Sequence, residues 1–385
     1  MFDEEKQPVR VTSFPRGTLL LNRLMQELFV QLQESICLRS KLFEVRFLTT
    51  SIDQAVVVLL YKVPLTDAWK AEATRLAKVL KVKVIGRARK MKFVASGIII
   101  APTVSTASSS NADTTIIEGT SGIYSNRNEA SVNSTSTGED DSDAEAEADG
   151  DFLEDGDESV REVLTVGDRS FIYYQTEGAF SQPNARVCEK MLQFAIEASQ
   201  GALQEDLLEL YCGGGTFTIA LAHCYRNVLA TEMSKMSVQL GKKAIQENGI
   251  TNIKIARLSS EEFTEAYSQT RSFQRLQDSD IDLSTYNLTT VLVDPPRAGL
   301  DKSTCQLISR FDKIIYISCN PVTLARDLEV LTATHSIARL AAFDQFPYTD
   351  HLECGVFLVK NKDVVDDHNS ASILGKRPIE EDPIA

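Results

Sequence analysis

Leu207-Leu208-Glu209-Leu210-Tyr211, followed directly by Cys212-Gly213-Gly214-Gly215-Thr216-Phe217, is the clearest indication of the fold of this 385-residue chain. The apolar run predicts a buried strand, and the residues after the glycines predict a helix. Glycines in such a turn let the backbone approach a ligand closely where the helix begins. No Gly-Lys-Ser/Thr sequence follows, which argues against a phosphate-binding P-loop.

An acidic residue ends the next predicted strand: Glu232 comes 19 residues after Gly213. A carboxylate at this place suits the hydroxyls of a ribose, so the loop fits either a dinucleotide or S-adenosylmethionine. A tight turn that binds no ligand is the alternative. Asp294-Pro295-Pro296 follows a later strand, and its prolines fix a rigid turn beside the carboxylate. Together with the glycine loop, this turn favours a methyltransferase sheet over a dehydrogenase.

From about residue 182 onward, apolar runs typical of strands alternate with segments of helical periodicity. This alternation predicts an α/β fold with a doubly wound sheet and antiparallel strands at its end. The further strands are expected at 228–232, 253–256, 290–294, 313–318, 338–343 and 355–359, and the helices at about 234–247, 260–268, 302–310 and 322–333.

The N-terminal residues predict a separate, small α/β module over roughly 8–100. We expect helices at 17–36 and 66–79, strands at 42–48 and 54–61, and one long strand at 82–93 with a strongly basic continuation. Residues 103–158 differ, because they are rich in Ser, Thr and acidic side chains. Such a segment cannot bury enough apolar surface to offset its ordering entropy, so we expect a disordered loop.

The charge is unevenly distributed along the chain. Residues 1–100 carry a net charge of +8, residues 101–160 one of −14 and residues 161–385 one of −8. The acidic balance of the whole chain therefore does not exclude a nucleic-acid partner. We expect the basic stretch Arg87-Ala88-Arg89-Lys90-Met91-Lys92 to contact phosphates, with a solvated strand face as the alternative.

The seven cysteines are scattered and form no C-x-x-C pair, and the chain has only four histidines. This pattern of cysteines and histidines predicts reduced thiols in an intracellular protein without a metal or an iron–sulfur cluster. No apolar run reaches the roughly 20 residues that span a bilayer. We expect a monomer in the cytoplasm, and the sequence leaves the nucleus or an organelle open.

Cys319 lies just beyond a predicted buried strand, where open α/β sheets bind their ligands. A thiolate can add to C6 of a pyrimidine, which makes C5 nucleophilic enough to accept a methyl group. A carboxylate such as Glu353 could then accept the C5 proton. The alternative for Cys319 is a buried core thiol, which is how we interpret Cys37, Cys188, Cys212, Cys224, Cys305 and Cys354.

Five motifs, taken together, resemble the bacterial-type tRNA (uracil-5-)-methyltransferases, an RNA m5U methyltransferase family. They are Phe180-Ser181-Gln182-Pro183-Asn184, Leu208 to Gly213, Asp294 to Asp301, Ser318-Cys319-Asn320-Pro321 and Phe343 to Tyr348. The resemblance implies that Cys319 is the nucleophile, that Glu353 removes the C5 proton, and that the substrate is the T-loop uridine of tRNA. It also implies S-adenosylmethionine contacts from Gln182, Tyr211, Thr216, Glu232 and Asp294.

The resemblance gives a role to each part of the chain. Residues 161–361 are expected to form a Rossmann-like S-adenosylmethionine-dependent catalytic domain, and residues 1–100 a partial N-terminal RNA-binding domain that lacks the family's first strands. Residues 101–160 form an acidic insertion and residues 362–385 a polar tail. Thr216 stands where bacterial members carry Asn. The lack of a TRAM-like barrel and of a four-cysteine pattern disfavours the ribosomal-RNA branch. The alternatives are an rRNA uridine-C5 methyltransferase and a catalytically silent RNA-binding or RNA-folding protein.

Overall fold

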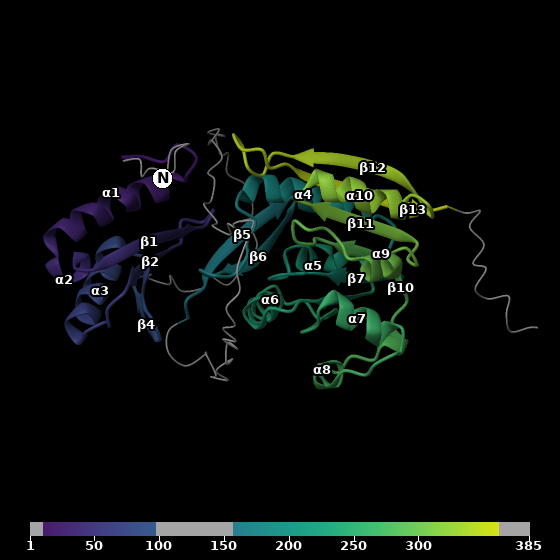
Figure 1. Ribbon diagram of the computed structural model, residues 1–385, viewed down its shortest axis with the longest axis horizontal. Helices are drawn as coiled ribbons and strands as arrows, with labels where there is room; N and C mark the ends of the chain where they lie inside the picture. Colours follow the sequence, from purple (N-terminus) through teal and green to yellow (C-terminus); the bar gives the residue numbers. More distant parts are fainter. Residues whose placement is uncertain (1–10, 98–156, 362–385) are drawn as a thin grey trace, which may run out of the picture.

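The computed structural model describes residues 11–97 and 157–361, which form two α/β domains joined by a β-hairpin (Figure 1). The predicted tail and residues 101–156 of the predicted insertion lie outside the described residues. No helix in the described part is both long and apolar enough to cross a membrane.

The N-terminal domain is a four-stranded sheet covered by helices whose apolar sides form one core. The sheet order is β1-β2-β3-β4, with β2 and β3 parallel and the outer pairs antiparallel. Leu24, Trp69 and Leu76 are buried between the helices and the sheet. Thr66 caps the helix that begins at Asp67, because its hydroxyl accepts from the Trp69 amide. The elements are α1(Leu19–Glu34), α2(Ile36–Arg39), β1(Leu42–Thr49), β2(Ala55–Tyr61), α3(Asp67–Leu80), β3(Lys83–Ala88) and β4(Met91–Ser96).

The expectation of one long basic strand over 82–93 is wrong. The chain reverses at Arg89, which takes a left-handed conformation with φ 50°, and β4 returns antiparallel to β3. Arg87 therefore lies opposite Lys92 instead of five residues along the same strand. Arg89 and Lys90, at the turn, are both exposed.

A hairpin that the sequence analysis missed, β5(Val160–Val166) and β6(Arg169–Gln175), connects the two domains. Val160 packs against Val56, Val58 and Ile85 on the second face of the N-terminal sheet. The carboxylate of Glu162, only 1 % exposed, accepts hydrogen bonds from the amide and the hydroxyl of Ser51. The hairpin therefore gives the N-terminal sheet a second apolar contact and fixes it to the catalytic domain.

The catalytic domain is a seven-stranded sheet with the order β12-β13-β11-β10-β7-β8-β9. The strands from β11 to β9 are parallel, whereas β13 is antiparallel to both β11 and β12. This arrangement confirms the predicted doubly wound sheet with antiparallel strands at its end. The strands are β7(Asp206–Leu210), β8(Asn227–Thr231), β9(Ile253–Ala256), β10(Leu288–Val293), β11(Lys313–Ser318), β12(His335–Phe343) and β13(Glu353–Lys360).

Helices cover both faces of this sheet, and each face has its own buried cluster. One face is covered by α4(Ala185–Ala198), α5(Thr216–Leu221) and α6(Lys235–Glu247), and the other by α7(Ser260–Tyr267), α9(Lys302–Ile308) and α10(Pro321–Leu331); α8(Gln274–Asp278) is a short peripheral helix. The carboxyl ends of the parallel strands all point to one edge of the sheet, and this edge carries the residues discussed below.

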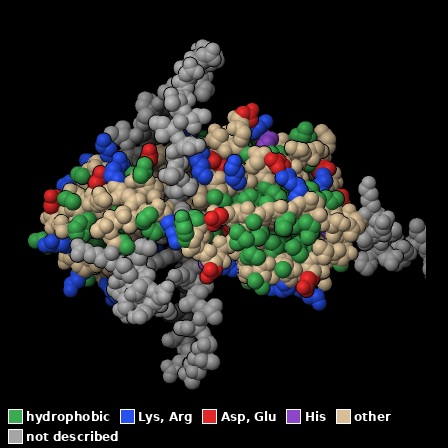
Figure 2. All heavy atoms as spheres, turned by 90° about the horizontal axis from the view of Figure 1, so that it is seen from above, with side chains coloured by type: hydrophobic (Ala, Val, Ile, Leu, Met, Phe, Trp, Pro, Cys, Tyr) green, Lys and Arg blue, Asp and Glu red, His purple; other side chains and the backbone are tan. Residues whose placement is uncertain are grey.

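The outer strand β12 lies at the upper side of the molecule in Figure 1. Its Ile337 and Leu340 are exposed, and Figure 2, seen from this side, shows hydrophobic side chains gathered over the catalytic domain. The register of β12 against β13 is interrupted between Ile337 and Arg339. Such an irregularity twists an edge strand and reduces its tendency to pair with another chain.

Candidate active site

Cys319 follows the last residue of β11 and precedes α10. In the antiparallel register, Ser318 pairs with Cys354, so the next step along both strands places Cys319 opposite Glu353. The thiol is partly buried. Burial, followed by the nearby Glu353 and Asp294 carboxylates, raises the pKa of Cys319 to about 11, while Arg297 acts to lower it. The free protein therefore holds Cys319 mainly as the thiol at neutral pH.

Glu353, the first residue of β13, is 3 % exposed, and its Oε2 has no hydrogen-bond partner among the described residues. Burial raises its pKa to about 7, against the opposing effect of Arg297. A carboxylate that is half ionised near neutral pH can accept and release a proton readily. The unpaired oxygen leaves its lone pairs available for that role.

Asp294, directly after β10, belongs to a chain of side-chain contacts. Gln345 Nε2 donates to Gln182 Oε1 at 2.9 Å, which turns the amide nitrogen of Gln182 toward Asp294 Oδ2 at 3.5 Å. Burial, followed by repulsion from Glu353, raises the pKa of Asp294 well above its usual range. Gln182 and Asp294, both expected to contact the cofactor, are thus brought together.

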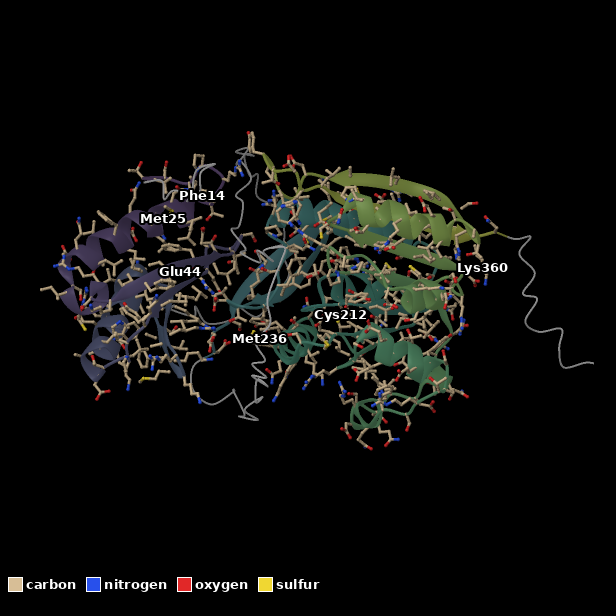
Figure 3. All side chains as sticks on the ribbon, in the orientation of Figure 1. Phe14, Met25, Glu44, Cys212, Met236 and Lys360 are labelled. Carbon is tan, nitrogen blue, oxygen red and sulfur yellow. The ribbon has the colours of Figure 1, made fainter. Side chains whose placement is uncertain are left out.

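The glycine loop after β7 is shaped by residues in left-handed conformations. Tyr211, Gly213 and Gly215 have φ values of 62°, 55° and 83°. A Cβ atom added at Gly213 or Gly214 would meet no atom within 4 Å, so the loop faces open space where a ligand can lie against the backbone. Figure 3 shows the adjoining Cys212 within the catalytic domain, and Cys212 is buried there as a packing residue, as expected.

Glu232 lies at the end of β8, next to the glycine loop. Its Oε2 accepts from the Gly213 amide at 2.9 Å and its Oε1 from the Ser234 amide at 2.7 Å. These bonds fix the carboxylate, and each oxygen keeps a lone pair for a ribose hydroxyl. Tyr211 is partly buried and its hydroxyl donates to Ser260 Oγ at 2.6 Å, so its ring is fixed beside the loop.

A cleft lies between the β5–β6 hairpin, the 180–185 segment and the glycine loop. Gln182, Gly214 and Thr216 line it, whereas Tyr211, Glu232 and Asp294 lie outside this lining. Thr216 also accepts a hydrogen bond from the Tyr173 hydroxyl through its carbonyl oxygen.

The carboxylates near this edge favour a positively charged ligand. Glu209 in β7 is 1 % exposed, and burial raises its pKa to about 8, with Asp294 and Glu232 adding to the effect against the hydrogen bond from Thr218. A bound cation would relieve the repulsion among these groups. S-adenosylmethionine carries a sulfonium and an ammonium charge, so the open backbone, the fixed Glu232 and the acidic surroundings fit it.

The sequence analysis assigned no role to Glu209, Arg297 or Gln345, although all three stand in the quoted motifs. The burial of Glu209 in β7 and the contact of Gln345 with Gln182, 163 positions away, leave no local pattern in the sequence. Arg297 makes a contact that the sequence also did not reveal. Its carbonyl oxygen accepts from Asn320 Nδ2 at 2.9 Å, which fixes the Asp294 turn beside Cys319. Within the described residues, no group of His, Cys, Asp and Glu could hold a metal ion.

The family model for tRNA (uracil-5-)-methyltransferases matches residues 1–110 and 145–361. The chain belongs to this family. It is 43 % identical to a tRNA/tmRNA (uracil-C(5))-methyltransferase of Saccharophagus degradans, over 93 % of this chain and 81 % of that protein. A protein of the same description from Acinetobacter baumannii is 40 % identical over 93 % and 82 %.

A solved structure has the same fold. The Pyrococcus abyssi tRNA (uracil-54, C5)-methyltransferase in complex with S-adenosyl-L-homocysteine aligns with a TM-score of 0.58 and 19 % identity, covering 93 % of this chain and 72 % of that one. The predicted Rossmann-like methyltransferase fold is confirmed. Family membership also confirms the predicted enzyme class, an S-adenosylmethionine-dependent methyltransferase that acts on uracil C5 of tRNA.

Proposed function

We propose that this protein converts a T-loop uridine of tRNA to 5-methyluridine through a covalent bond between Cys319 and C6. The observation that carries this proposal is the pairing of Ser318 with Cys354, which places Cys319 and Glu353 one position beyond the last pair of β11 and β13. A thiol and a nearby base are the two groups that methylation at an unactivated pyrimidine carbon requires. The residues proposed to bind S-adenosylmethionine are Gln182, Tyr211, Thr216, Glu232 and Asp294.

Cys319 acts first in the proposed mechanism. The uridine leaves its stack, because its ring atoms are inaccessible within folded RNA. The Cys319 thiolate forms a bond with C6, and the electron pair of the C5–C6 double bond moves toward C5 and O4. Arg297 favours this step, because its charge opposes the effect of burial on the pKa of Cys319.

Glu353 acts in the second half. Bound S-adenosylmethionine supplies an electrophilic methyl group, which C5 accepts. Glu353 then takes the proton from C5, the double bond re-forms, and the bond between Sγ and C6 breaks with its electron pair returning to sulfur. Because its pKa is about 7, Glu353 is ionised often enough to act as the base and can pass the proton to water afterwards.

The experiment that tests the proposal uses tRNA that contains 5-fluorouridine. Fluorine at C5 cannot leave as a proton, so the purified protein should accumulate a covalent complex with this tRNA in the presence of S-adenosylmethionine. Cys319→Ala should form none and should transfer no methyl group to normal tRNA. Cys354→Ala, which removes a buried neighbouring thiol, should still form the complex. Methyl transfer that survives Cys319→Ala would refute the mechanism.

Separate pools of tRNA and rRNA decide the substrate class. We expect labelled methyl groups from S-adenosylmethionine in tRNA, and label confined to rRNA would favour the rRNA alternative. The domain of residues 11–97 is proposed to bind the RNA backbone. We also infer a cytoplasmic monomer, which sedimentation and cell fractionation would test.

A further inference from the structure

Tyr348 is the most exposed aromatic residue of the loop between β12 and β13, with a side chain that is 86 % exposed. Its φ of 64° places it in the left-handed region, which is unusual for a bulky residue. Backbone strain of this kind persists where the surrounding structure enforces it, and it is concentrated at ligand-binding sites. An aromatic ring held in solvent by a strained backbone therefore indicates a ligand-binding site.

Arg16 of the N-terminal domain fixes this ring from one side. Its guanidinium lies 5.0 Å from the centre of the Tyr348 ring, and its Nη2 donates to the Tyr348 carbonyl at 3.3 Å. Figure 1 shows the β12–β13 loop reaching toward the segment that precedes α1. The high exposure of Tyr348 leaves the rest of the ring open to solvent, next to the positive charge of Arg16.

Both ends of this loop are anchored in the active site. Gln345, which is fully buried, donates to Gln182, and Glu353 begins β13. Tyr348 lies five positions before Glu353, which limits the distance between their Cα atoms to roughly 18 Å. Phe346 and His351 brace the loop with an edge-to-face contact at 5.8 Å. The ring is thus held on a braced loop that leads directly to Glu353, the proposed base.

We propose that Tyr348, supported by Arg16, is a stacking platform for a nucleobase next to the target uridine in the substrate RNA. This proposal rests on the proposed function. When the uridine leaves its stack, the neighbouring base loses a stacking partner, and an aromatic ring replaces that contact without regard to base identity. The Arg16 guanidinium strengthens binding further, because it lies where it can attract the phosphate that joins the two nucleotides.

The test compares two substitutions of Tyr348 in the full chain, using a T-arm RNA hairpin. Tyr348→Asn removes the ring but keeps the loop backbone, since Asn tolerates left-handed conformations. Tyr348→Phe keeps the ring. We expect Tyr348→Asn to weaken RNA binding roughly 5- to 150-fold and Tyr348→Phe to leave it within about twofold. The Kd for S-adenosylmethionine should be unchanged in both variants.

A fluorescent probe locates the platform. With 2-aminopurine placed in turn at the nucleotides flanking the target uridine, one position should be quenched by the wild type and by Tyr348→Phe, but not by Tyr348→Asn. Equal RNA affinity and equal quenching in all three proteins would overturn the proposal, as would equal losses in both variants, which would implicate the hydroxyl group. If the wild type forms no covalent complex with 5-fluorouridine RNA, the proposed function fails instead.

Discussion

Glu353 carries the first prediction at the scale of single residues. Glu353→Gln keeps the shape of the side chain but removes the base, so the Cys319 bond to C6 should form while proton removal slows by roughly 10²- to 10⁴-fold. On normal tRNA, the covalent complex should therefore accumulate in the variant and only transiently in the wild type. Gel electrophoresis of quenched single-turnover reactions measures this. Release at the wild-type rate would exclude Glu353 as the base.

The pH dependence of the same step follows from the pKa of Glu353. The ionised carboxylate is the active base, and its pKa is raised to about 7, so release in the wild type should accelerate as the pH rises through 7. Glu353→Gln should lose this dependence around pH 7. The pKa of Cys319, raised to about 11, affects formation of the covalent complex and not its release, because the sulfur is bonded to C6 in that complex.

The proposed reactive pair could be named from the sequence, but its surroundings could not. Cys319 and Glu353 each stand next to a recognisable strand, and the motifs that contain them are distinctive. The link from Gln345 through Gln182 to Asp294 joins residues that are 163 and 112 positions apart, and hydrogen bonds at such separations leave no periodic signal. Burial was equally hidden, so the raised pKa of Glu209 emerged only from the fold.

At the scale of elements, strand β7 contains a carboxyl group that weakens the fold at high pH. Burial raises the pKa of Glu209 from 4.5 to about 8, so the folded state binds this proton more tightly than the unfolded state. The stability that protonation of Glu209 contributes is complete below about pH 4.5 and is lost as the pH rises through 8. Glu209→Gln, still able to accept from Thr218, should therefore be more stable than the wild type at pH 8.5, by up to a few kcal/mol.

Urea unfolding of the cofactor-free protein at pH 5.5 and 8.5 measures this difference. Glu205, just before β7, provides a control of opposite sign. Burial acts to raise its pKa, but hydrogen bonds and charge from Thr289 and Lys313 outweigh that effect and lower it. Glu205→Gln should therefore lose stability at both pH values. An identical pH dependence in Glu209→Gln and the wild type would contradict the prediction.

The β3–β4 hairpin carries a prediction about RNA binding. Arg87 pairs with Glu158 and Glu177, and Lys92 pairs with Glu158. The charges of these two basic residues are therefore already paired with carboxylates within the protein. Arg89 and Lys90 are exposed at the turn. If they contact phosphates, Arg89→Gln with Lys90→Gln should reduce the slope of log K against log salt by roughly 2. Lys78→Gln, on the exposed side of α3, should leave it unchanged, and an unchanged slope in the double variant would remove the turn from the interface.

Sequence periodicity did not predict the β3–β4 hairpin or the β5–β6 hairpin. Residues 82–93 alternate well enough for one strand, and only the left-handed Arg89 divides them into β3 and β4. The β5–β6 hairpin escaped notice because its inward side chains include polar ones such as Glu162, whose burial depends on Ser51 in the other domain. The parallel strands were predictable because they are buried on both faces and therefore continuously apolar.

At the scale of the whole molecule, the N-terminal domain is held to the catalytic domain by charges that converge on β6. Glu177, just beyond β6, pairs with Arg46 of β1 at 2.5 Å and with Arg87 of β3 at 3.0 Å, and its side chain is 10 % exposed. A carboxylate shielded in this way contributes more than a surface ion pair, because removing it takes a shared partner from both cations and leaves Arg46 with Glu44 and Arg87 with Glu158. The docking of the two domains should therefore depend on it.

Glu177→Ala should loosen this docking without disturbing either core. We expect a lower unfolding midpoint, by several degrees, and a broader transition as the two domains begin to unfold separately. Methyl transfer to tRNA should fall while the Kd for S-adenosylmethionine is retained, because the cofactor residues lie within one domain and the proposed RNA surface spans both.

Glu27→Ala is the matched control, since its pair with Arg23 is exposed on α1 and should contribute less than about 1 kcal/mol. Calorimetry of the two variants decides the matter: a single, unshifted transition in Glu177→Ala would mean that the apolar contacts of β5 hold the domains together without this carboxylate.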